Sequence, residues 1–265
     1  MTTATMPLSR RVRPLAGVRQ SVSLSWRTLV SIKHSPMELV DFSIQPIMFL
    51  LLFTYVFGGA IAGSTGDYLT FALPGIIVQN VMFATLNTGM GLNTDLTKGV
   101  FDRFRALPIA RWAPLAGRIV ADLVKQAWAI ALLFGLGMIM GFRVGTDVPS
   151  VLGAFLLLLA FSLAVSWVAV LVGVLVNEPE KVMIFGMAVM FPLTFISNTF
   201  VPARTMPGWM QGFVDVNPIT HISDATRGLL VGGPVAGPVA MTLLWAAGII
   251  VVFAPLAVRG YRRRV

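Results

Sequence analysis

The chain has 265 residues, of which 56% are hydrophobic and 12% are charged, and its formal net charge is +9. These fractions lie well above and well below those of soluble domains, so we expect an integral membrane protein. The absence of cysteine excludes disulfides and thiol chemistry, and anionic lipid is a simpler partner for the positive charge than nucleic acid.

The N-terminal residues 1–37 are expected to form a cytoplasmic tail followed by an amphipathic helix. Their apolar side chains recur at three- and four-residue spacing, which is the pattern of a helix with one apolar face: Leu15, Val18, Val22, Trp26 and Leu29. Such a helix would lie on the inner leaflet, either as an anchor alone or also as a contact for a cytoplasmic protein. No cleavable signal peptide is predicted, because this stretch lacks an apolar core beside a small-residue cleavage site.

Six stretches of the chain carry no Asp, Glu, Lys, Arg or His: 42–66, 68–94, 126–142, 148–177, 182–203 and 228–258. A helix needs about 20 residues to cross ~30 Å of hydrocarbon, so five stretches are long enough, and the third is long enough if it begins near Ile119. We therefore predict an all-α fold in which residues 38–265 form one transmembrane domain. Its six helices are placed at about 42–64, 69–93, 119–142, 150–176, 182–203 and 236–258.

The basic residues between these helices are distributed unevenly. Of the 20 Lys and Arg residues, 17 fall on one side, and only Arg143, Arg204 and Arg227 fall on the other. The positive-inside rule then places both chain termini in the cytoplasm. Both termini can lie on one side only when the number of spans is even, which agrees with six. We expect a multi-pass protein of the bacterial cytoplasmic membrane.

The loop after the second predicted span contains a short amphipathic segment. Val100, Phe101, Phe104 and Leu107 fall on one helical face, with charged residues around the rest, and Pro108 ends the pattern. Aromatic and arginine side chains are typical of a helix that docks into a protein groove. The same helix could instead rest on anionic lipid, and the residues alone leave both readings open.

The segment between the fifth and sixth predicted spans is too short to form a soluble domain of its own. Trp209, Met210 and Phe213 are grouped at helical spacing, Asn217-Pro218 interrupts the pattern, and Ile219 and Ile222 resume it. We predict two short interfacial or re-entrant helices within residues 204–233, on the non-cytoplasmic side.

The sequence lacks the usual signatures of an enzyme or of an ion-driven carrier. No Gly-Lys dipeptide occurs, so there is no phosphate-binding loop of the Walker type. His34 and His221 are placed on opposite sides of the membrane, and no catalytic, cofactor or metal site is predicted. None of the six apolar stretches holds an acid that could load a coupling ion. An energy source in a partner protein is therefore favoured.

Several motifs resemble one family of membrane proteins. They lie at 45–59, 73–76, 206–209, 216–220 and 227–230, and the most specific is Lys-Gly-Val-Phe-Asp-Arg-Phe-Arg-Ala-Leu-Pro-Ile at 98–109. The chain is similar, from about residue 24 onwards, to the membrane subunits of type-2 ATP-binding-cassette (ABC) exporters. It is especially similar to the daunorubicin and doxorubicin resistance permeases of actinobacteria.

The resemblance implies features that composition alone does not. Such subunits have six spans and pair as dimers, here by default as a homodimer. Each binds a separate cytoplasmic ATPase, two copies in all, which holds the ATP and Mg²⁺. The N-terminal amphipathic helix would be the connecting helix. The coupling helix that enters the ATPase would comprise Gly99, Val100, Phe101, Asp102, Arg103, Phe104, Arg105 and Leu107.

The leading hypothesis is an exporter subunit that moves an amphipathic drug, lipid or secondary metabolite outward. Polar residues inside the apolar stretches are candidates for its path, although such groups also bond across helices: Gln79, Asn80, Asn87, Ser197 and Asn198. Two alternatives remain open. One is an ion-coupled multidrug carrier, and the other is a non-transporting scaffold that recruits a cytoplasmic protein through residues 98–118.

Overall fold

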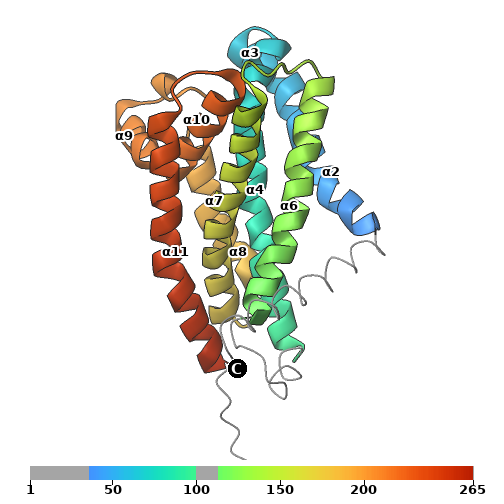
Figure 1. The fold of residues 1–265 in the computed structure, drawn as a ribbon, viewed down its shortest axis with the longest axis vertical. Helices are drawn as coiled ribbons and strands as arrows, with labels where there is room; N and C mark the ends of the chain where they lie inside the picture. Colours follow the sequence, from blue (N-terminus) through green and yellow to red (C-terminus); the bar gives the residue numbers. More distant parts are fainter. Residues whose placement is uncertain (1–35, 100–112, 265) are drawn as a thin grey trace, which may run out of the picture.

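The computed structural model describes residues 36–99 and 113–264, and throughout these two ranges the regular structure is helical (Figure 1). The long helices run lengthwise in a bundle. They are α2 (Pro36–Leu52), α4 (Thr65–Thr97), α6 (Ala113–Ile139), α7 (Val148–Leu175), α8 (Pro179–Phe195) and α11 (Ala236–Arg264). Short elements cover one end: α3 (Gly58–Ala62), α9 (Gly208–Val216) and α10 (Pro218–Val231). We call this the capped end; helix α11 ends at the opposite end.

Five of the described helical stretches are long and apolar enough to cross a membrane: Ser43–Ala62, Thr65–Thr97, Leu115–Ile139, Val148–Leu175 and Ala236–Arg264. They correspond to the first, second, third, fourth and sixth predicted spans. The fifth, α8, has only 17 residues, which is the lower limit for a spanning helix at about 17–25 residues. The all-helical membrane fold is therefore confirmed, with five candidate spans.

Capping residues explain where several helices begin. The side chains of Ser64, Asp147 and Asn217 accept hydrogen bonds from the first turns of α4, α7 and α10. Such caps satisfy amide groups that have no partner inside the helix. Pro179 and Pro218 stand at the first position of α8 and α10, where proline is tolerated.

The predicted fifth span, 182–203, is helical only as far as Phe195. The carbonyl oxygens of Leu193 and Ile196 accept hydrogen bonds from the Asn217 side chain, each at 2.7 Å. The side chain of the residue that caps α10 thus supplies the donors that another turn of α8 would have supplied. The chain then continues as an irregular segment, residues 196–202, before the short 3₁₀ turn Ala203–Thr205.

The first candidate span also departs from a regular α-helix. Between α2 and α3, residues Phe53–Phe57 form a π-helical turn, a feature that often marks a functional position. Thr54 is buried in this turn, and its hydroxyl oxygen has no hydrogen-bond partner within the described part of the chain. Gly63, with φ +76°, ends α3 in the left-handed conformation that favours glycine.

Helix α4 is the centre of the bundle. Of its most apolar stretch, 78% is buried, compared with 11% for α11, and α7 packs extensively on both helices. The two glycines where α4 crosses α7 allow the close approach. A methyl group added at Gly173 would lie 2.4 Å from the Gly89 carbonyl oxygen.

Replacing Gly173 with alanine is therefore expected to lower stability by about 1–3 kcal/mol, the usual cost of overpacking. Gly248→Ala is the matched control, because a methyl group there meets no described atom within 4 Å and alanine favours the helix. Thermal unfolding of both variants in detergent measures the difference. Equal unfolding temperatures would show that the α4–α7 crossing tolerates the extra methyl group.

Candidate functional site

A cavity of about 280 Å³ lies between α2, α4 and α8. Because the side chains at 76, 79, 80, 83 and 87 recur at helical spacing, they line it from one face of α4. The complete lining is Gln45, Pro46, Phe49, Ile76, Gln79, Asn80, Phe83, Ala84, Leu86, Asn87, Met183 and Met187.

The lining combines side-chain amides with aromatic and thioether groups. Each amide can both donate and accept hydrogen bonds, and methionine adapts its shape to different neighbours. None of the twelve lining residues carries a charge. The cavity is therefore suited to an uncharged or weakly polar group with a large apolar surface.

Three of the five predicted path residues, Gln79, Asn80 and Asn87, face this one cavity. Gln45 joins them from α2, and the sequence analysis did not single it out. The sequence does mark Gln45 as an amide within an apolar stretch. It lies four residues before Phe49, so the two side chains share one helical face, and both line the cavity.

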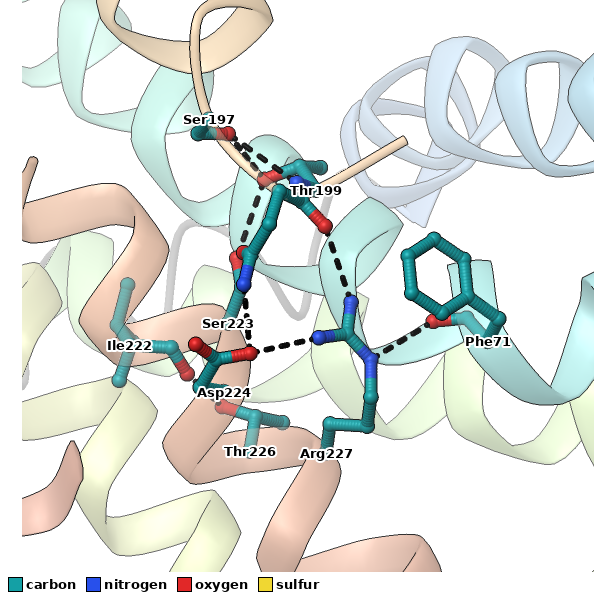
Figure 2. A network of polar contacts seen from close by, with 9 residues as sticks. Phe71, Ser197, Thr199, Ile222, Ser223, Asp224, Thr226 and Arg227 are labelled. Carbon is teal, nitrogen blue, oxygen red and sulfur yellow. Dashed lines mark hydrogen bonds and ion pairs between the residues drawn. The ribbon is translucent and has the colours of Figure 1, made fainter. Parts of the chain in front are cut away.

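Ser197 and Asn198 lie elsewhere, in a polar network at the capped end (Figure 2). The Arg227 side chain, from α10, donates hydrogen bonds to the carbonyl oxygens of Phe71 and Asn198, both at 3.2 Å, and to the Asp224 carboxylate at 2.8 Å. Its guanidinium also lies 4.2 Å from the centroid of the Phe71 ring. One arginine thus joins α4, α10 and the irregular segment 196–202.

Two further contacts strengthen this network. The Asn198 amide donates to Asp224 at 2.6 Å, and the hydroxyl groups of Thr199 and Ser223 lie 3.1 Å apart. Burial lowers the pKa of Arg227, while the charge of Asp224 opposes that change. Because a guanidinium stays protonated in proteins, Arg227 keeps its positive charge within this network.

The predicted coupling helix begins at Gly99, which adopts φ +65° directly after α4. Its other residues, Val100 to Leu107, lie outside the described residues, as does the predicted connecting helix. The helix ends that flank this segment are joined by Arg118 of α6, which pairs with Asp95 at 2.8 Å and with Asp122 at 3.2 Å. Gly91 leaves the space that the Arg118 guanidinium occupies.

The ABC-2 type transporter family model matches residues 19–231. The chain belongs to the ABC-2 type transporter family. It is 45% identical over 259 residues to a daunorubicin resistance ABC transporter permease of Streptomyces coeruleorubidus, a match that covers 97% of this chain and 92% of that protein.

Two further relatives are less similar to the chain. A probable doxorubicin resistance permease of Mycobacterium tuberculosis is 28% identical over 250 residues, covering 93% of this chain and 89% of the relative. A second doxorubicin resistance permease of that organism is 28% identical over 229 residues, covering 79% and 77%. Together with the apolar helices, family membership identifies a multi-pass protein of the bacterial plasma membrane.

Proposed function

We propose that this chain is the membrane subunit of an ATP-driven exporter that moves an amphipathic drug, lipid or secondary metabolite out of the cell. Two such subunits would pair, and each would bind one cytoplasmic ATPase that holds ATP and Mg²⁺. The observation that carries the proposal is the uncharged, amide-lined cavity between α2, α4 and α8. Its chemistry fits an amphipathic cargo, and the relatives named for daunorubicin and doxorubicin resistance agree with that class.

The proposed topology has six spans, with α8 as the short fifth span and both termini in the cytoplasm. The distribution of basic residues supports it. Lys98, Lys181 and the C-terminal arginines 262–264 lie near the helix ends opposite the capped end. Arg143, Arg204 and Arg227 lie in or beside the elements of the capped end. By the positive-inside rule, the capped end faces outward.

A matched pair of substitutions tests the role of the cavity. Gln79 lines the cavity, whereas Gln211 lies on α9 and donates to the Met206 carbonyl oxygen. Gln79→Leu removes one hydrogen-bonding group from the path at similar volume. With one bond contributing about 1 kcal/mol, the daunorubicin concentration that half-saturates transport should rise about fivefold.

The measurement is ATP-dependent uptake of daunorubicin into inverted vesicles that also contain the partner ATPase. Gln211→Leu should leave the half-saturating concentration unchanged. An unchanged value for Gln79→Leu as well, at normal expression, would show that the cargo does not use the cavity.

A further inference from the structure

Residues 197–200 of the irregular segment 196–202 are buried although their backbone is not helical. Ser197, Thr199 and Phe200 are no more than 6% exposed. Near a membrane, an unpaired backbone carbonyl costs free energy, so such a segment needs partners from neighbouring elements. Those partners are side chains: Asn217 donates to the Ile196 carbonyl oxygen, Arg227 to that of Asn198, and the Tyr68 hydroxyl to that of Phe200.

The segment lies directly beyond the cavity, on the side of the capped end. A methyl group added at Gly75 would lie 2.4 Å from the Thr199 carbonyl oxygen, and the next residue, Ile76, lines the cavity. Residues 196–201 therefore pack against α4 at the point where the cavity lining begins.

A row of aromatic rings connects the cavity to the segment. Phe49 lines the cavity and stacks on Phe53, with centroids 5.4 Å apart. Phe53, in the π-helical turn, stacks on Phe200 at 4.5 Å, and Phe200 lies 5.1 Å from Phe195 at the end of α8. A cargo that displaces the Phe49 ring would therefore press on the segment through Phe53.

We infer that Arg227 is a positioning residue of the export step: it holds residues 196–201 as a closed plug at the capped end of the cavity. The plug must separate from α10 and α4 before cargo can leave. This inference rests on the proposed function and specifies which part of the chain moves. Because the Arg227 bonds reach three elements, releasing this one side chain removes the bond from α10 to the Asn198 carbonyl oxygen and the bond between α10 and α4. The other side-chain contacts of the plug, from Tyr68, Asn217 and Ser223, separate when the plug moves.

A reversible cross-link tests whether the plug must move. The sequence contains no cysteine, so a pair can be introduced without background. Thr199 and Ser223 are suitable because their hydroxyl oxygens lie 3.1 Å apart, within reach of a disulfide. ATP-dependent daunorubicin transport by the Thr199→Cys/Ser223→Cys complex should fall to background on oxidation and return on reduction.

The two single-cysteine variants should transport at the same rate before and after the same oxidation. Mass spectrometry confirms the disulfide, and a pull-down confirms that the ATPase stays bound. Full transport by the cross-linked complex would overturn the inference, and failure of the disulfide to form would contradict the closed contact. If the unmodified complex fails to transport with ATP, the proposed function itself fails, which is a distinguishable result.

Substitution of Arg227 gives a second readout. Arg227→Met removes the bond to the Asn198 carbonyl oxygen of the plug, so ATP turnover without cargo should rise and its stimulation by daunorubicin should shrink. Arg227→Lys keeps the charge and one donor group, and should restore part of the stimulation. Arg143→Met is the matched control, because Arg143 is exposed and, within residues 36–99 and 113–264, donates to the carbonyl oxygens of Met138 and Phe142, which are close to it in the sequence. Unchanged stimulation in Arg227→Met would contradict the inference.

Discussion

Replacing Phe104 with aspartate is expected to abolish binding of the partner ATPase. Phe104 lies in the predicted coupling helix, outside the described residues, so this expectation comes from the sequence pattern. Buried aromatic side chains at protein interfaces commonly contribute about 2 kcal/mol or more, and adding an unpaired charge costs more. Affinity should therefore fall more than about tenfold.

A pull-down of the ATPase from detergent extracts measures this loss. Phe213→Asp is a matched control, because Phe213 is a half-exposed ring of α9 at the capped end. That variant should bind the ATPase normally, and both variants should insert into the membrane. Normal binding by Phe104→Asp would indicate that this helix rests on lipid.

Replacing Asn217 with leucine is expected to lower stability more than the Gly173→Ala substitution does. Asn217 is 2% exposed, and it does two things at once. Its side-chain oxygen caps α10 at the Ile219 amide, at 2.9 Å, while its amide group donates to the carbonyl oxygens of Leu193 and Ile196. Losing the cap and leaving two carbonyl oxygens unpaired should together cost about 3 kcal/mol or more.

Thermal unfolding in detergent measures this cost. Asn80→Leu is the control, because it makes the same change on the wall of the cavity and should alter stability much less. Equal unfolding temperatures for the two variants would show that Asn217 does not hold the end of α8 against α10.

The sequence was sufficient to predict the features that depend on local pattern. Five of the six apolar stretches correspond to candidate spans, and the turn at Asn217-Pro218 corresponds to the junction of α9 and α10. These predictions succeed because membrane helices need about 20 apolar residues, and because Asn and Pro favour helix starts.

The predicted fifth span was wrong beyond Phe195, and other features of the fold also depend on residues that are distant in the sequence. Helix α8 stops at Phe195 because of Asn217, and Arg227 bonds to Phe71, which is 156 residues away in the chain. Ser197 and Asn198 appear in the sequence as polar residues of a span, like Gln79 and Asn80. Only the fold separates the pair in the polar network from the pair in the cavity.

The lining of the cavity also depends on residues that are distant in the sequence. Gln45 and Met183 come from helices far apart in the sequence, and neither has a local pattern that marks a site. Spacing along α4 brought Gln79, Asn80 and Asn87 to one face, but the opposite walls depend on how α2 and α8 pack. A prediction from spacing alone could therefore include the α4 residues that line the cavity and still omit Gln45.

The most direct test asks what energy drives transport. Proteoliposomes should contain this chain with or without its partner ATPase, and accumulation of daunorubicin against its gradient should be followed. We expect accumulation only when the ATPase and ATP·Mg²⁺ are both present, with none from a proton gradient alone. Accumulation driven by a proton gradient in the absence of the ATPase would contradict the account.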